Sequence, residues 1–348
     1  MIKKLLLILL LCSVCQAAQI IRYVDPDVVA GDGSGDSWTN AYASLFAWEA
    51  AEETDLDAAN NYMTVYCRSS AGTADTATCI IAGWATSATD YIEIIGSDFP
   101  SDGIWDATKY VIHDNNATLS AIEVHELYVK IINLQVLLTT TTGTKYGILV
   151  WGDGDNSTVD SCFVKGICSG TGAAWGIQYT NTSTPNVIYN TVVSGFKSGT
   201  DNNFGGIFAT SSSGVTIYNS TVTGCRTGVN SAGGTIAMYN CALGLNDYTE
   251  YLVGTIDYCC STDGVGTNAQ TPLDGDWAKE WTASGSNDFS LLVGGNCVGN
   301  GTDNPGSGLY SDDIIGTSRT TVWDIGAFEY TAGAPAAAGG QLIMIQEF

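Results

Sequence analysis

The sequence predicts an all-β solenoid in which short strands stack as parallel rungs. Two recurring phrases carry this prediction. In the first, apolar residues flank a central turn position, and the centres fall at residues 133, 161, 190, 219 and 240. In the second, Gly is followed by Ile or Val at residues 147, 176, 206 and 228. The two phrases share a spacing of 28 to 30 residues and shorten together to 21 or 22 at the end, which is typical of a structural repeat.

Each repeat has room for about three short strands and shows no helical pattern, so its apolar side is buried only by stacking on its neighbours. Two inward stacks are expected: Ile131, Val159, Ile188, Ile217 and Met238, and then Val136, Val164, Val193, Val222 and Leu243. Between them a ladder at a turn is expected: Asn133, Asn190, Asn219 and Asn240, with Ser161 interrupting the row. Asn tolerates left-handed backbone geometry and its amide can bond the amides above and below, so this ladder is predicted to be structural.

This pattern resembles the right-handed parallel β-helix of the pectate-lyase-like superfamily, whose turns carry such asparagine ladders. Residues 23–26 (Tyr-Val-Asp-Pro) and the Gly/Asp-rich residues 31–38 resemble the opening of secreted β-helix proteins. Residues 324–330, preceded by Gly316 and Arg319, resemble the closing motif of choice-of-anchor Q proteins. The resemblance covers residues 20–330. It implies fold and secretion but no particular reaction, because members of this class mostly lack an assigned activity.

The N-terminus has the pattern of a signal peptide, residues 1–18. Lys3 and Lys4 precede an apolar stretch too short to span a bilayer, and cleavage is expected after Ala17 or Ala18. The protein is therefore predicted to be secreted, extracellular or on the cell surface, with no membrane span in the mature chain. An N-terminal anchor and a lipoprotein site at Cys12 or Cys15 are the alternatives.

One β-helix domain is expected over residues 19–330: an N-terminal cap (19–60), the rungs (61–262) and an irregular C-terminal wrap (263–330). A helix capped by Thr39 or Asn40 and running to about Glu53 is expected to plug the first rung. Strands of the early rungs are expected at residues 63–67, 79–82, 91–95, 110–113 and 121–124. An Ala/Gly/Pro linker (331–340) and an apolar strand (341–348) follow.

Composition excludes several function classes. The net charge of −24 argues against binding nucleic acid or anionic membranes, which need a basic face. The 45% apolar content excludes disorder. Nine cysteines remain after residue 18, an odd number, so at least one stays free or pairs between molecules. The mature chain has no Cys/His cluster of the kind that binds zinc.

Catalytic candidates are few. Lyases of the superfamily use Arg or Lys as a base, aided by calcium on clustered carboxylates. Lys197 and Arg226 lie in register, each seven residues past its ladder position, and Asp201 follows. No rung carries the carboxylate pair that a hydrolase needs, so a solvated face is favoured.

Calcium is the one cofactor considered. Asp153, Asp155 and Asp160 are expected to cluster near Trp151, and the first two are calcium candidates. Asp32 and Asp36 form a second acidic turn, which lacks a later bidentate Glu and is favoured as a structural turn.

Glycosylation and assembly sites complete the candidates. Sequons mark Asn116, Asn156, Asn181 and Asn300 as glycan acceptors, while Asn219 is expected to point inward. The C-terminal run suggests an assembly strand: Leu342, Ile343, Met344, Ile345 and Phe348. It either caps its own β-helix, joins the next subunit, or acts as a sorting signal.

Two functions therefore compete. The first is a non-catalytic extracellular structural or surface protein that assembles head to tail with copies of itself. The alternative is a polysaccharide lyase or hydrolase that acts on an extracellular glycan.

Overall fold

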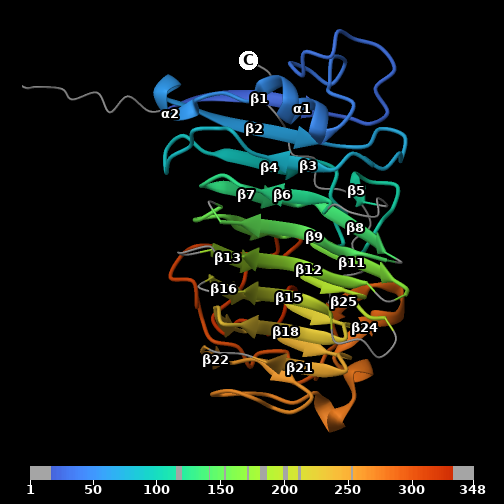
Figure 1. Ribbon diagram of the computed structural model, residues 1–348. Coiled ribbons are helices and arrows are strands. Elements are labelled where there is room, and N and C mark those ends of the chain that lie inside the picture. The colour runs from blue at the N-terminus through green and yellow to red at the C-terminus, as the bar shows by residue number, and fades with distance from the viewer. Residues whose placement is uncertain are drawn as a thin grey trace, which may run out of the picture.

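The computed structural model describes residues 17–114, 120–140, 142–152, 154–170, 172–180, 186–198, 203–210, 213–251 and 254–331. The chain forms a parallel β-helix with three long sheets (Figure 1). Sheet 1 has nine strands: β1 (Ala18–Val24), β2 (Asn61–Cys67), β4 (Ile92–Gly96), β7 (Val129–Ile132), β10 (Thr158–Asp160), β13 (Asn186–Tyr189), β16 (Gly214–Tyr218), β19 (Thr235–Tyr239) and β22 (Ile256–Asp257).

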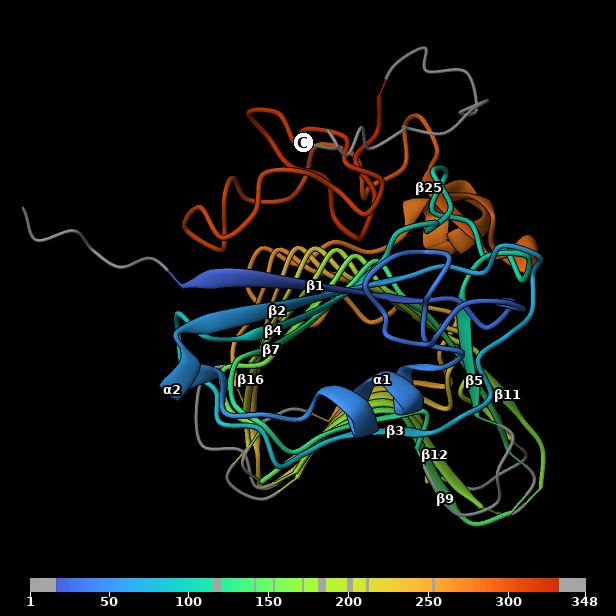
Figure 2. The same cartoon turned by 90° about the horizontal axis from the view of Figure 1, so that it is seen from above.

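The other two long sheets have seven strands each. Sheet 2 contains β5 (Val111–Asp114), β8 (Gln135–Thr140), β11 (Phe163–Cys168), β14 (Val192–Ser194), β17 (Thr221–Thr223), β20 (Ala242–Gly244) and β23 (Cys260–Ser261). Sheet 3 contains β3 (Cys79–Ile81), β6 (Ile122–Val124), β9 (Thr144–Trp151), β12 (Ala173–Thr180), β15 (Phe204–Thr210), β18 (Thr227–Ala232) and β21 (Tyr248–Tyr251). Seen from the N-terminal end, the chain passes clockwise through sheets 1, 2 and 3 as it recedes, so the coil is right-handed (Figure 2).

The strand register confirms both inward stacks. Val159 pairs with Ile131 on one side and Ile188 on the other. Val164 pairs in the same way with Val136 and Val193. These side chains are almost completely buried, and each contributes roughly 1.5–3 kcal/mol of hydrophobic stabilisation. The five early strands also form, within a residue or two of their predicted limits.

The Gly-Ile phrase marks the strands of sheet 3, where Ile177 pairs with Ile148 and Ile207. Its glycines have a steric reason. A Cβ on Gly176 would lie 2.4 Å from Cγ1 of Val193 and 2.7 Å from the carbonyl oxygen of the glycine one rung on. Only a residue without a side chain fits between the close-packed rungs at this point.

The capping helix starts later than predicted. Helix α1 (Leu45–Glu52) begins after Ser44, whose hydroxyl accepts a hydrogen bond from the Ala47 amide at 3.0 Å. The predicted caps Thr39 and Asn40 were wrong because the following residues pair with β1, where the Tyr42 amide donates to the Tyr23 carbonyl.

The N-terminal elements close the first rung. Helix α1 packs on β3, the end strand of sheet 3, and Trp48 stacks on Trp84 with ring centroids 5.5 Å apart. A short helix, α2 (Leu56–Ala59), leads into β2. The cap therefore covers the end strand of sheet 3, whose backbone groups would otherwise meet water.

Residues 263–331 fold back over the outside of the β-helix (Figure 2). Their regular elements are short: η1 (Leu273–Gly275), η2 (Trp277–Lys279), β24 (Trp281–Ala283), η3 (Ser284–Ser286) and β25 (Asp288–Leu291). They build a second hydrophobic cluster, in which Trp281 and Phe289 cover outward residues of sheet 2 such as Phe163. Sheet 2 is therefore buried on both faces over its later rungs. None of the helices in the described part of the chain is long and apolar enough to span a bilayer.

Candidate functional site

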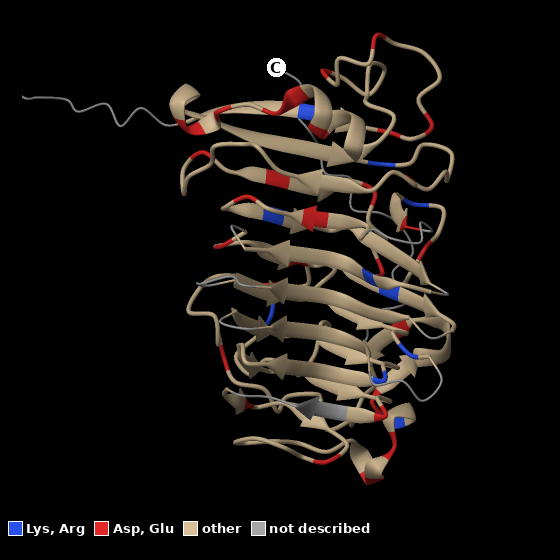
Figure 3. Cartoon of the chain, in the orientation of Figure 1, with Lys and Arg blue, Asp and Glu red and all other residues tan. Residues whose placement is uncertain are grey.

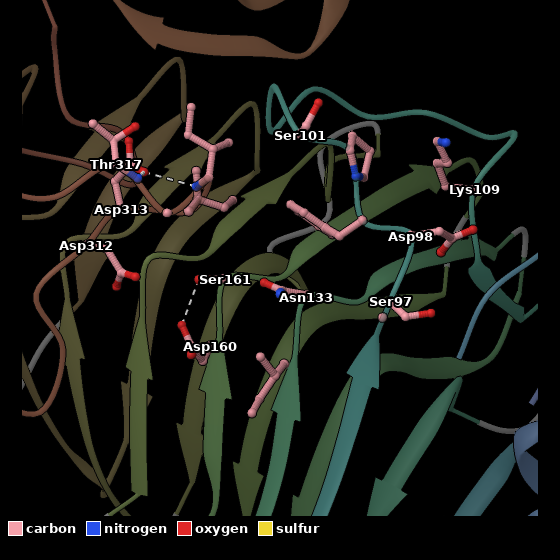
Figure 4. A pocket seen from close by; sticks show the side chains of 17 residues that line it. Ser97, Asp98, Ser101, Lys109, Asn133, Asp160, Ser161, Asp312, Asp313 and Thr317 are labelled. Atoms are coloured by element: carbon pink, nitrogen blue, oxygen red, sulfur yellow. Dashed lines mark hydrogen bonds between the residues drawn. The ribbon is translucent and has the colours of Figure 1, made fainter. Parts of the chain in front are cut away.

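A hollow of about 750 Å³ opens beside the turn between sheets 1 and 2 (Figure 4). Its walls come from residues 96–101 at the end of β4, Lys109 before β5, the ladder turns at the ends of β7 and β10, and residues 312–317 of the C-terminal segment. Carboxylates, hydroxyls, the Lys109 ammonium and the Asn133 amide line it, together with apolar side chains such as Phe99 and Ile314. The hollow therefore offers hydrogen-bonding groups and apolar surface to one ligand.

Asp160 lies in this hollow because of the strand period. Val159 faces the core, so its neighbour Asp160 faces outward, between Ile132 and Tyr189 on the adjacent strands. The chain then turns at Ser161, which has a φ of 51°. The Ser161 hydroxyl donates to Oδ1 of Asp160 at 2.7 Å, and the Tyr189 hydroxyl donates to the same carboxyl group.

The surroundings change the acidity of Asp160. Burial raises its pKa to about 7, although the hydrogen bonds from Ser161 and Tyr189 oppose this rise. The nearby carboxylate of Asp312 also contributes to this raised pKa (Figure 4). A carboxyl group that is partly protonated near neutral pH, beside a second carboxyl group, has the chemistry of a general acid and base pair.

Two other acids of the hollow hold the backbone. Asp98 accepts hydrogen bonds from the amides of Ser69 and Tyr110. Asp313 accepts from the amides of Ile315, Thr317 and Glu329. Burial raises the pKa of both Asp98 and Asp313, against these hydrogen bonds. Both carboxylates therefore fix the loops that shape the hollow.

The structure does bring the predicted pair Lys197 and Arg226 together, because both bind the same carboxylate, Asp247. Asp247 accepts a hydrogen bond from Nζ of Lys197 and another from Nη1 of Arg226 at 2.7 Å. The Arg226 guanidinium also lies 4.9 Å from the ring centre of Tyr248. Burial alone would raise the pKa of Asp247, but the two cations lower it below its usual value. Both candidate bases are thus ion-paired, and Asp201 lies outside the described residues.

Asp247 could have been found from the sequence. It lies seven residues after Asn240, which is the register of Lys197 and Arg226 on their own rungs. Asp312 could not have been found in this way, because residues 263–331 carry no repeat that would place it beside Asp160.

Of the acidic cluster expected near Trp151, the structure sets Asp160 apart. Asp155 precedes β10 and Asp160 ends it, so the two carboxylates lie at opposite ends of that strand. The Trp151 ring instead stacks on His125, with centroids 6.3 Å apart. Asp153 lies outside the described residues.

The other calcium candidates hold their own turn. Oδ1 of Asp32 accepts from the Ser34 amide at 3.0 Å, and Oδ1 of Asp36 accepts from Nδ2 of Asn40 at 2.9 Å. Over the residues that the structure describes, no group of three or more His, Cys, Asp or Glu side chains is arranged to hold a metal ion.

The asparagine ladder has the predicted backbone but different partners. Its residues take left-handed conformations, with φ between 39° at Asn219 and 54° at Asn133. One amide-to-amide bond is present, from Nδ2 of Asn240 to Oδ1 of Asn219 at 3.3 Å. Three ladder amides bond the C-terminal segment: Asn190 donates to the Asp312 carbonyl, Asn219 to the Asp324 carbonyl and Asn240 to the Thr302 carbonyl. The ladder is therefore the surface to which the C-terminal segment binds.

The structure describes some of the glycosylation candidates and none of the assembly residues. Asn300 is exposed, Asn156 is half-buried, and Asn219 is completely buried as expected. Asn116, Asn181 and the assembly residues Leu342, Ile343, Met344, Ile345 and Phe348 lie outside the described residues.

Comparison with known proteins adds little about function. No family model matches the chain, and no curated protein matches it. Among solved structures the chain is similar to a "Crystal structure of pectate lyase Pel9A", with 14% identity and a TM-score of 0.39, over 90% of this chain and 97% of that one. The β-helix assignment rests on the strand order and register of the chain itself, and the choice-of-anchor Q resemblance stays a prediction.

Proposed function

We propose that this chain is a non-catalytic, extracellular structural or surface protein that assembles head to tail through its C-terminal strand. The observation that carries this proposal is the outer edge of β1. This strand is the first of sheet 1 and pairs with β2 on one side. Over the described residues, no strand pairs with its other side along residues 18–22.

The backbone of β1 offers hydrogen bonds at that edge. The Ala18 amide donates to the Asn60 carbonyl at 3.0 Å, so every second residue from Ala18 directs its peptide groups toward β2. The N–H groups of Gln19 and Ile21 therefore point outward, while the outward carbonyl of Ile21 accepts a hydrogen bond from Nη1 of Arg22 at 2.9 Å. The Ile21 side chain is 36% exposed. An exposed strand edge of this kind is a template for adding a strand from another chain.

The chain contains a segment suited to that edge. Residues 341–348 carry an unbroken apolar run, Leu342 to Ile345, behind an Ala/Gly/Pro linker. A strand buried between two β-helices needs apolar side chains on both faces. Because donor and acceptor surfaces differ, each added copy leaves a new free edge, and the assembly grows as a filament.

The distribution of charge supports a structural role. In Figure 3 most residues of the strands are neither acidic nor basic, and most charged residues lie at strand ends and in loops. The candidate bases Lys197 and Arg226 are engaged by Asp247. Strand faces of this kind suit a filament whose sides are exposed to solvent and whose subunits contact one another at the ends of the β-helix.

Truncation of the tail tests this proposal. The mature chain and a variant in which a Gly/Ser segment of equal length replaces residues 341–348 are compared by size-exclusion chromatography with light scattering and by negative-stain imaging. Oligomers or filaments are expected from the first and monomers from the second. Monomers from both chains would contradict head-to-tail assembly.

The hollow favours a second candidate, a polysaccharide-acting enzyme of the hydrolase type. Asp160, with its raised pKa, and Asp312 supply an acid and a base. Release of new reducing ends from an extracellular glycan, lost in both Asp160→Asn and Asp312→Asn, would establish it. Release of unsaturated uronates, lost in Lys197→Ala or Arg226→Ala, would instead establish a lyase.

A further inference from the structure

Two consecutive cysteines in the last rung face opposite sides of the β-helix wall. Cys259 belongs to the inner core, where its Sγ accepts a hydrogen bond from the Cys241 amide at 3.4 Å. Cys260 begins β23 and points outward into the second hydrophobic cluster, beneath the C-terminal segment. That segment brings Cys297 into the same cluster.

Cys260 and Cys297 meet at a rigid point of the fold. Both side chains are completely buried, and the two thiols form a hydrogen bond. The Cys260 amide donates to the Cys241 carbonyl at 2.9 Å. On the other side, the Cys297 amide donates to Oε2 of Glu280 at 2.8 Å, and its carbonyl accepts from the Ile325 amide at 2.8 Å. Backbone hydrogen bonds therefore fix the two chain segments that carry these neighbouring cysteines.

We propose that Cys260 and Cys297 form a disulfide bond that ties the C-terminal segment to the last rung. The oxidant is a low-molecular-weight disulfide such as oxidised glutathione. One cysteine thiolate attacks it and releases one thiol. The second cysteine then attacks the mixed disulfide and releases the other thiol. Two cysteine thiols lose two protons and two electrons, and the small disulfide becomes two thiols.

The bond must form while the chain folds. The hydrogen bond with Cys260, together with burial, raises the pKa of Cys297 well above its usual value. In the folded protein burial closes both side chains to an oxidant. The Cys297 thiol is also protonated, and a thiol in that state is a poor nucleophile. Oxidation before the C-terminal segment closes avoids both obstacles.

Peptide mapping of the refolded chain tests the proposal. The full mature chain is denatured, reduced, refolded in a buffer of reduced and oxidised glutathione, alkylated and digested without reduction. Mass spectrometry is expected to find the peptide that contains Cys260 linked to the peptide that contains Cys297, and reduction is expected to separate them. Free alkylated Cys260 and Cys297 in the refolded wild-type chain would overturn the proposal.

Variants of Cys259 and Cys260 show which of these two adjacent cysteines is linked to Cys297. Cys259 and Cys260 are adjacent, so a peptide mass alone does not separate them. Cys259→Ser is expected to keep the link to Cys297, and Cys260→Ser is expected to lose it. The reverse result, or a link from Cys297 to any other cysteine, would overturn the assignment. If Cys260→Ser does not refold, the wild-type and Cys259→Ser maps still decide the question.

Discussion

Nη2 of Arg319 donates a hydrogen bond to Oδ1 of Asn190 at 3.0 Å, which joins the C-terminal segment to the asparagine ladder. The same guanidinium donates from Nη1 to Oε2 of Glu329 at 3.2 Å and from Nε to the Asp312 carbonyl at 3.1 Å. Its side chain has no exposed surface. One buried cation thus bonds a ladder amide, a carboxylate and the loop that carries Asp312.

Replacing Arg319 by Met is expected to destabilise the protein by about 3–5 kcal/mol, because the Glu329 carboxylate would remain buried without its partner. Chemical denaturation measures this loss. Limited proteolysis should show cleavage within residues 297–330 before the rungs are cut, since these residues dock through the ladder.

A partly exposed ion pair provides the control for Arg319. Arg22 pairs with Glu52 and keeps 26% of its side-chain surface exposed. Arg22→Met is therefore expected to cost less than about 1 kcal/mol. Equal losses of unfolding free energy in the two variants would contradict the expectation that burial makes the Arg319 ion pair more important for stability.

The rungs could be predicted from the sequence because each one repeats the last. Once Val159 is placed inward, parallel pairing fixes Ile131 and Ile188 beside it. The same register also predicts the left-handed turn at Asn190. A period of this kind encodes contacts between neighbouring rungs and nothing beyond them.

The partners from the C-terminal segment could not be predicted. Asn190 bonds Arg319 and the Asp312 carbonyl, which come from residues without a repeat. The repeat predicts an amide-to-amide ladder because it relates each rung only to its neighbours. It does not predict the hollow, since the C-terminal segment supplies one of the walls.

The carboxyl group of Asp160 makes stability depend on pH. Its pKa of about 7 lies above the ordinary value of 3.8, so between these values the folded protein binds more protons than the unfolded chain. Its contribution to stability is complete below the ordinary value and is lost as the pH rises toward about 7. Asp160→Asn is therefore expected to lessen the loss of stability between about pH 5 and about pH 8.

Denaturant unfolding of the wild type and Asp160→Asn at the two pH values measures this difference. Burial also raises the pKa of Asp324, to about 6, so part of the decline should remain in the variant. The same decline in both proteins would contradict a raised pKa at Asp160.

Asp247→Asn is expected to destabilise the protein modestly, by about 0.5–1 kcal/mol, because Lys197 and Arg226 would then face each other without a shared carboxylate. The loss should shrink as salt is added, since these groups are partly exposed. Denaturation at low and high ionic strength measures it. Asp274→Asn, which breaks the isolated pair with Lys279, is the control and should cause no measurable change. A loss at Asp247 that salt does not alter would argue against an electrostatic origin.

Ile21→Pro tests the assembly edge without disturbing the fold. The Ile21 amide points away from β2, so proline removes no hydrogen bond of sheet 1, and an outward N–H on an edge strand is a place where proline is tolerated. The ring would however remove a donor from an added strand and hinder its approach. We expect the association constant to fall by at least about tenfold, which is about 1.4 kcal/mol, in analytical ultracentrifugation. Ile21→Val keeps the N–H and should assemble as the wild type does. Unchanged assembly of the proline variant would place the joining surface elsewhere than β1.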